Sequence, residues 1–163
     1  MSHGTSDTMS IEMSNESSIE KEALERFYAA INRHDMQAIT DDFDPQIVRV
    51  EFEDSPTGGT YRGIADVREN VSKGRGTWAE GSCEPEQFLI NGEKIVVYLH
   101  ARVRLKGATD WTGGRFADGF AFRDGRIVEH RSFGERGQAL DWAGIDDPEA
   151  CRVAGAAEPP QGA

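Results

Sequence analysis

The second half of the chain alternates apolar and polar residues over several long segments, and this pattern constrains the fold more than any other feature. Alternation at every second residue is typical of strands that bury one face. Asn91-Gly92 and Asp124-Gly125 interrupt the pattern with dipeptides that favour tight hairpin turns. The sequence therefore predicts a run of strands that pair antiparallel, at about 83–90, 94–105, 112–123 and 126–134.

The start of the chain predicts two helices in succession. Ser17 and Glu20 form a capping-box pattern, and the apolar residues that follow recur at helical spacing as far as His34. Asp35 is a favourable N-cap for a short second helix, which Pro45 is expected to stop. The first helix carries one apolar face, which must pack against another element.

A strand, a helix and a loop are expected before the hairpin run. The strand covers 47–54, and a third helix follows Gly63 and gives way to a loop over 72–82. The predicted apolar face of the strand carries Val48, Val50 and Phe52. Helices placed early and strands placed late favour an α+β domain, with N-terminal helices on a mostly antiparallel sheet.

Charge and hydropathy exclude several classes of partner. A formal net charge of −11 disfavours binding to phosphate backbones and to anionic membranes. No apolar run approaches the roughly 18 residues of a membrane span, and the N-terminus lacks the features of a secretory signal. We therefore expect a cytoplasmic protein that binds neither nucleic acid nor membrane.

The chain has two cysteines. Cys83 and Cys151 lie far apart and have no partner at metal-ligand spacing, so we interpret both as incidental thiols.

The periodic pattern covers only the middle of the chain. Residues 1–16 are polar and rich in serine and acidic side chains, and residues 145–163 lack any apolar period. We therefore predict one folded domain over residues 17–144, between a disordered N-terminal tail and a flexible C-terminal tail.

Two carboxylates lie on faces that are otherwise apolar. Asp54 continues the apolar face of its strand, and Asp118 shares a strand face with phenylalanines. Desolvation raises the pKa of a buried carboxyl group, so Asp118 is expected to be neutral and able to donate a proton. Alternatively, Asp54 begins a turn and Asp118 lies at a bulge beside Gly119. The phenylalanines on the Asp118 face are Phe116, Phe120 and Phe122.

Two histidines in the predicted strands are further candidates. His130 shares a face with Val128 and Ser132, and a histidine between strands is often a structural residue. The hydrophobic pattern of its strand would turn His100 to solvent, unless a second subunit covers that face in a homodimer. No close cluster of metal ligands and no phosphate-binding glycine loop occurs, so we predict neither a metal nor a cofactor. His100, His130 and Asp118 would form a metal site only by meeting in three dimensions.

Three stretches of the chain resemble a known family. They are EALERFYAAINRHD at 22–35, VEFEDSPTGGTYRG at 50–63 and DGFAFRDGRIVEH at 118–130. Over residues of about 18–143 the chain resembles the nuclear-transport-factor-like cone fold, the superfamily of ketosteroid isomerases and SnoaL-like polyketide cyclases. The resemblance implies a curved sheet and helices that enclose a cone-shaped pocket.

The resemblance also implies roles for individual residues. Asp54 is similar to the general base of the isomerases. Asp118 is similar to their protonated aspartate, a carboxylic acid that an apolar site keeps neutral so that it can donate to the enolate oxygen. Phe27 falls where the isomerases have their oxyanion tyrosine, with Tyr28 one step off. Ser132 stands where the cyclases have their acid–base aspartate. By the same register the side chains expected to face the cavity include Tyr98, His100 and Arg102.

The expected function is a cofactor-independent isomerase, cyclase or dehydratase that acts on a small hydrophobic carbonyl compound. Asp54 or His130 would remove a proton, Asp118 would stabilise the enolate oxygen, and His100 would be a second donor. A neutral Asp118 further predicts that Asp118→Leu leaves thermal stability similar or higher. The alternative is a non-catalytic binding or dimerisation module of the same fold. The expected apolar walls are Phe27, Phe43, Trp78, Phe116 and Phe120.

Overall fold

The computed structural model describes residues 19–52 and 58–146. The N-terminal helix covers residues 19–32 of this part, and its predicted cap at Ser17 lies outside it. The other elements, in chain order, are η1 (Ala38–Thr40), β1 (Phe43–Val50), β2 (Thr60–Arg62), α2 (Ile64–Arg75), β3 (Trp78–Asn91), β4 (Lys94–Leu105), β5 (Thr112–Arg123), β6 (Arg126–Phe133) and α3 (Arg136–Ala143).

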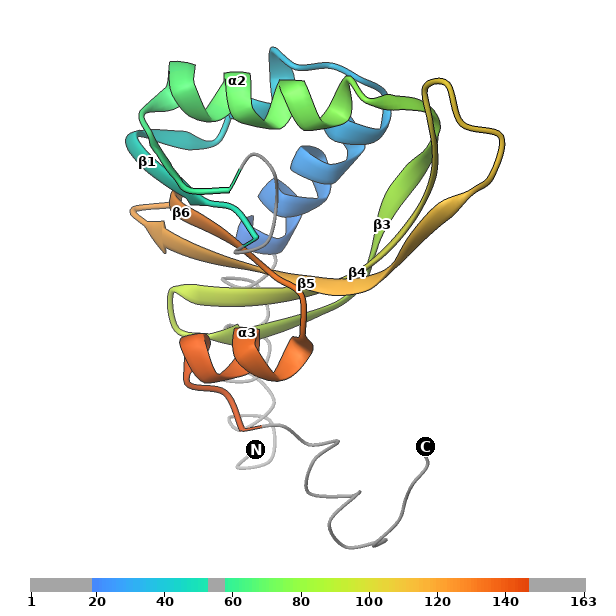
Figure 1. Ribbon diagram of the computed structural model, residues 1–163. Coiled ribbons are helices and arrows are strands. Elements are labelled where there is room, and N and C mark those ends of the chain that lie inside the picture. The colour runs from blue at the N-terminus through green and yellow to red at the C-terminus, as the bar shows by residue number, and fades with distance from the viewer. Residues whose placement is uncertain (1–18, 53–57, 147–163) are drawn as a thin grey trace, which may run out of the picture.

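Six strands form one mixed, curved sheet in the order β2-β1-β6-β5-β4-β3. Only β1 and β6 run parallel, and the other neighbouring strands pair antiparallel. The sheet does not close on itself. The N-terminal helix and α2 lie on its concave side, and α3 lies on the opposite side (Figure 1). The predicted α+β class and its helices packed on a curved, mostly antiparallel sheet are confirmed.

The two faces of the sheet bury separate apolar clusters. Along β4, Ile95, Val97 and Leu99 pack toward the N-terminal helix, whereas Val96 and Tyr98 pack with α3 on the other side. The hydrophobic pattern of this strand therefore predicted its inner face correctly. The register implied by the resemblance, which turned Tyr98 and its even-numbered neighbours toward the cavity, is wrong.

Several predicted boundaries need correction. Pro45 does not end a helix, because it lies within β1. The predicted loop over 72–82 is occupied by the last turn of α2 and the start of β3. Asp35 does act as predicted, since its Oδ1 accepts a hydrogen bond from the Ala38 N–H at 3.1 Å. The helix α3 had no counterpart in the sequence prediction.

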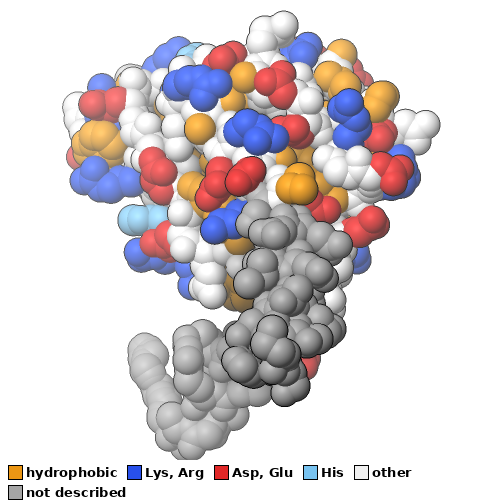
Figure 2. All heavy atoms as spheres, turned by 180° about the vertical axis from the view of Figure 1, so that it is seen from behind, with side chains coloured by type: hydrophobic (Ala, Val, Ile, Leu, Met, Phe, Trp, Pro, Cys, Tyr) orange, Lys and Arg blue, Asp and Glu red, His pale blue; other side chains and the backbone are white. Residues whose placement is uncertain are grey.

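The surface seen from behind carries basic side chains interspersed with acidic ones (Figure 2). This mixture agrees with a surface whose charges serve solubility. No helix within residues 19–52 and 58–146 has the length and apolar character required to cross a membrane. The predicted tail over 1–16 and most of the predicted tail over 145–163 lie outside the described residues.

Candidate functional site

A cavity of about 290 Å³ opens between the N-terminal helix, α2 and the inner face of the sheet. Its volume is near the lower end of the range for small-molecule pockets. Apolar side chains form part of the wall, and they are Ile31, Phe52, Val71, Trp78, Cys83 and Phe116. The polar lining consists of Tyr28, Arg49, Glu51, Asn70, Arg75, Asp118, His130 and Ser132.

Asp118 is the centre of a buried hydrogen-bond network on the cavity wall. Its Oδ2 accepts a hydrogen bond from the Tyr28 hydroxyl at 2.5 Å and lies 2.9 Å from His130 Nε2. Its Oδ1 accepts a hydrogen bond from the Ser132 hydroxyl at 2.9 Å. The pairing of β5 with β6 sets Asp118 opposite Ser132, and the N-terminal helix brings Tyr28 from 90 residues away. Two elements, the N-terminal helix and β6, therefore aim three polar groups at one carboxyl group of β5.

The surroundings of Asp118 favour its ionised form. The residue is only 4% exposed, and burial alone would raise the pKa of the carboxyl group. His130, then Arg49 and the Tyr28 hydroxyl outweigh burial, so the pKa of Asp118 lies below its usual value. The burial predicted for this residue among phenylalanines is correct. The contacts do not support the predicted neutral, proton-donating Asp118, because the groups around it favour the charged form.

His130 is buried as a neutral imidazole. Burial, then the charge of Arg49, lowers the pKa of His130, and the opposing effect of Asp118 only partly compensates. The ring stacks on Phe120 with the centroids 4.4 Å apart. Because the Asp118 carboxylate is an acceptor, we assign the imidazole proton to Nε2. Nδ1 is then the unprotonated nitrogen, and it is buried with no hydrogen-bond partner among residues 19–52 and 58–146.

Tyr28 keeps its proton in this network. Burial, followed by the negative charge of Asp118, raises the pKa of the Tyr28 hydroxyl well above its usual value. A phenol held neutral in this way is a permanent donor to the carboxylate. The sequence placed Tyr28 one step away from the position of a family tyrosine, and the fold brings its hydroxyl to Asp118.

The end of β1 contributes a buried ion pair to the cavity. Arg49 Nη2 lies 3.1 Å from Glu51 Oε1, and Arg49 Nη1 donates to the backbone carbonyls of Val50 and His130. The predicted apolar face of this strand was therefore wrong, since Arg49 and Glu51 face the cavity together with Phe52. The pattern misled because these two charges compensate each other locally.

The helix α2 closes another part of the wall, which the sequence analysis missed. Asn70 is 5% exposed, and its Oδ1 is buried and has no hydrogen-bond partner in the described part of the chain. One turn later, Arg75 donates to the carbonyls of Ile31 and Asn32 and stacks on Trp78. Arg75 was missed because the last turn of α2 was expected to be a loop, whereas Asn70 is a polar residue in the part of the helix that the sequence did predict.

The site residues predicted from the sequence fall into three groups according to where the described structure places them. Those that line the cavity as predicted are Tyr28, Trp78, Phe116, Asp118, His130 and Ser132. Those that belong to the apolar core instead are Phe27, Phe43 and Phe120. Those on the opposite face of the sheet are Tyr98, His100 and Arg102. Asp54 lies outside the described residues.

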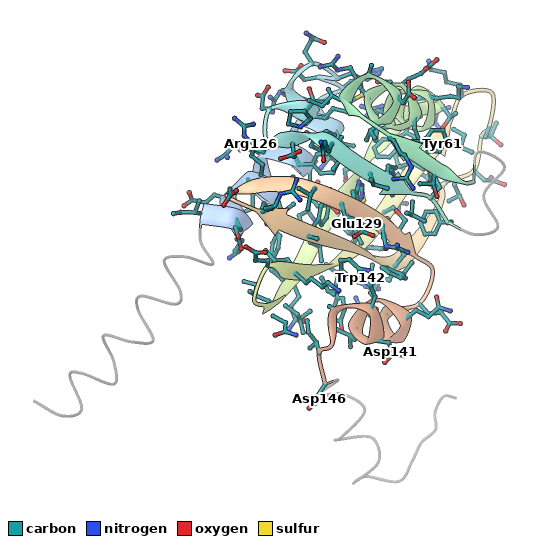
Figure 3. The ribbon with its side chains drawn as sticks, turned by 90° about the vertical axis from the view of Figure 1, so that its left-hand side faces the viewer. Tyr61, Arg126, Glu129, Asp141, Trp142 and Asp146 are labelled. Carbon is teal, nitrogen blue, oxygen red and sulfur yellow. The ribbon has the colours of Figure 1, made fainter. Side chains whose placement is uncertain are left out.

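The three residues of β4 that were wrongly predicted to face the cavity have other environments. His100 and Arg102 line a separate surface groove, in which the Arg102 guanidinium lies 4.5 Å from the centroid of the Trp111 ring. Tyr98 is stacked against Arg136 at 4.0 Å. Neither His100 nor Arg102 can therefore act in the cavity of the same chain. Figure 3 shows Glu129 of β6 and Trp142 of α3, which mark the side of the sheet away from the cavity.

No group of three or more histidine, cysteine, aspartate or glutamate side chains is arranged to hold a metal ion within residues 19–52 and 58–146. Asp118 and His130 therefore meet as a pair, and the third member considered for a metal site, His100, is on the other face.

A protein-family model described as the SnoaL-like domain matches residues 24–130 of the chain. No match was found among curated proteins. The family match begins within the N-terminal helix and ends in β6 at His130, so it includes Asp118 and His130 but not Ser132.

Solved structures share the fold at low sequence identity. TerC, co-crystallised with polyporic acid, is 21% identical with a TM-score of 0.64, and the match covers 77% of this chain and 97% of that chain. An NTF2-like protein from Burkholderia pseudomallei is 20% identical with a TM-score of 0.63, over 77% and 97% of the two chains. A protein with a ketosteroid isomerase-like fold from Catenulispora acidiphila, in complex with trimethylamine, is 14% identical with a TM-score of 0.62, over 77% and 94%. At these identities the likeness establishes the fold alone.

Proposed function

The chain belongs to the SnoaL-like domain family, and we propose that it is a cofactor-independent enzyme that moves a proton on a small, largely apolar carbonyl compound. The observation that carries the proposal is the buried Asp118 carboxylate, which holds His130 beside a cavity with aromatic walls. A carboxylate that orients an imidazole is a recurrent arrangement in acid–base catalysis.

His130 is the proposed general base. The lowered pKa keeps the imidazole neutral near pH 7, and the Asp118 carboxylate accepts the Nε2 proton and leaves a lone pair on Nδ1. The C–H bond next to the substrate carbonyl breaks, and its proton moves to Nδ1. This step requires the imidazole ring to shift so that the buried Nδ1 reaches the cavity. The electron pair of that bond moves toward the carbonyl oxygen to form an enolate. The imidazolium that results is stabilised by the Asp118 charge.

Arg49 is the proposed source of positive charge for the enolate. Its side chain is 8% exposed and lines the cavity, so its field is less screened there than in bulk water. Return of the proton to a different carbon would complete an isomerisation. If the substrate carries a hydroxyl group on the carbon β to the carbonyl, that C–O bond would break instead, and the hydroxide would leave as water with the proton of the imidazolium, which gives a dehydration.

The cavity volume limits the substrate. A volume of about 290 Å³ suits a compound of one or two rings, with a larger compound extending through the opening. The proposed partner is therefore a small hydrophobic molecule with a carbonyl group. Phe52 and Phe116, whose centroids lie 5.5 Å apart, would pack against its rings.

A non-catalytic binding module is the second candidate, and one observation favours it. Tyr28 and Ser132 both direct their hydroxyl groups at Asp118, so the carboxylate is already saturated by donors of the chain itself. A closed network of this kind is sufficient to fix the shape of a binding pocket without any transfer of a proton. The two candidates differ in whether bound carbonyl compounds exchange their α-protons.

The test is deuterium exchange at the α-carbon of 1-tetralone, a two-ring ketone, followed by proton NMR in D₂O. We expect exchange well above the buffer rate, and His130→Gln to lower it by a factor of about 100 or more. His100→Gln is the matched control, because His100 lies on the opposite face, and it should leave the rate unchanged. Binding without exchange would support the binding module, and an unchanged rate in His130→Gln would remove His130 from the mechanism.

The homodimer expected from the sequence stays a prediction. Light scattering coupled to size-exclusion chromatography would measure the mass in solution directly. A mass of one chain at all concentrations would contradict it.

A further inference from the structure

Arg75 is a cation on the cavity wall that has no acidic partner among the described residues. The other cavity arginine, Arg49, is paired with Glu51. Arg75 makes hydrogen bonds only to backbone carbonyls within that part of the chain, from Nε to Ile31 at 2.6 Å and from Nη2 to Asn32 at 3.1 Å. An arginine without a carboxylate is notable in a chain whose formal net charge is −11.

The guanidinium of Arg75 is held in a defined position. Its two carbonyl partners lie at the end of the N-terminal helix, and its central carbon lies 4.5 Å from the centroid of the Trp78 ring. A guanidinium has five N–H donors, and these two hydrogen bonds use two of them. The group is therefore oriented in advance while donors remain for another partner.

The charges elsewhere in the cavity do not compensate Arg75. Asp118 is surrounded by its three donors, and Glu51 is paired with Arg49. No other aspartate or glutamate of the described residues lines this cavity. An anion that enters the cavity would therefore meet one positively charged group that has no ion pair.

We propose that Arg75 binds a carboxylate of the ligand, so that the natural ligand is an aromatic or alicyclic carbonyl compound that also carries an acid group. This inference rests on the proposed function, because it assigns a second polar group to the same ligand. Planar carboxylates match the fork of a guanidinium, and stacking on Trp78 limits the entropy lost on binding. Val71 and Trp78 would flank the apolar body of the ligand.

Arg75 also stabilises the fold, and the test must separate this role from ligand binding. Its hydrogen bonds satisfy carbonyls at the C-terminus of the N-terminal helix, where a cation is favourable. A variant that only destabilises the fold would weaken the binding of all ligands by a similar factor. The ratio of two affinities measured on the same variant is insensitive to such a common loss.

The experiment compares 1-tetralones that carry a carboxylate on the aromatic ring with the corresponding carboxamides. The two substituents have nearly the same size and differ in charge. Each free position of the aromatic ring is tested by isothermal titration calorimetry at low ionic strength. For at least one position we expect the carboxylate to bind the wild-type protein about tenfold more tightly than the carboxamide.

Arg75→Gln should bring this ratio close to one, and Arg75→Lys should retain part of it. The matched control is Arg68→Gln on the same helix, since Arg68 donates to Thr40 and does not line the cavity. Equal binding of both probes by the wild-type protein, or an unchanged ratio in Arg75→Gln, would overturn the inference alone. Absence of binding by every probe would count against this inference and the proposed function together, whereas a carboxylate preference without proton exchange would overturn only the proposed function.

Discussion

Replacing Asp118 with leucine removes the acceptor of three buried hydrogen bonds in one step. Leucine is close in size to aspartate but has no polar atom. The hydroxyl groups of Tyr28 and Ser132 and the Nε2–H of His130 would then point at a methyl group. The expectation that this substitution leaves stability similar or higher assumed a carboxyl group without partners, whereas the structure makes it the acceptor of three hydrogen bonds.

The size of the effect follows from the network. Each buried donor that loses its partner costs about 1–3 kcal/mol, although the hydroxyl groups of Tyr28 and Ser132 can rotate toward the cavity. Burying the leucine side chain returns about 2 kcal/mol. We therefore expect a net loss of about 3 kcal/mol in the free energy of unfolding. Asp118→Asn should lose only about 1 kcal/mol, because its amide oxygen still accepts and its amide nitrogen can donate to Ser132.

The assay is urea denaturation at pH 7 followed by far-UV circular dichroism, on the wild-type protein and both variants. Asp110→Leu is the control, since Asp110 is exposed and its replacement should change stability by at most about 0.5 kcal/mol. A leucine variant as stable as the wild type, or less destabilised than Asp118→Asn, would refute the role of Asp118 as the acceptor of these three hydrogen bonds.

Three further predictions follow from the same contacts. Tyr28→Phe should cost about 1 kcal/mol in urea denaturation and raise the pKa of Asp118, because the carboxylate loses one of its three donors; an unchanged pKa in an NMR titration would argue against this hydrogen bond. Gly119→Ala should destabilise the fold by about 1–3 kcal/mol, since a Cβ there would lie 2.6 Å from Trp142 Cζ3, and thermal unfolding would detect the loss. Because burial lowers the pKa of His130, the unfolded chain binds a proton that the folded chain does not. Stability should therefore fall as the pH drops below about 6.5, by at most about 1.4 kcal/mol per pH unit from this group, and His130→Gln should lose less over the same range.

The fold was largely predictable because long alternating segments specify strands without reference to distant residues. The bounds of β4 and β5 agree with the predicted 94–105 and 112–123, and the inner face of β4 follows from its alternation. The helix α3 was missed because it follows a glycine-containing turn and its apolar residues cover a sheet face that only the fold defines. Trp142 packs over Gly119 of β5, which is 23 positions away in the chain and whose missing side chain makes the room.

The candidate site was predictable only in part. The burial of Asp118 follows from the phenylalanines that share its strand face, but its ionisation depends on Tyr28, His130 and Ser132, which only the folded chain brings together. Arg49 was missed for a related reason, since charged residues in a strand are normally expected to face solvent. A local pattern cannot show that a distant or neighbouring group will compensate a buried charge.

The ionisation of Asp118 can be measured directly by following its side-chain carboxyl carbon with ¹³C NMR during a pH titration, with Asp118→Asn used to assign the signal. We predict a single transition below the usual value of about 3.9 for aspartate, and no further titration of this carbon up to neutral pH. A transition well above that value would mean that the buried carboxyl group holds its proton, which would contradict the proposed orientation of His130 by a carboxylate.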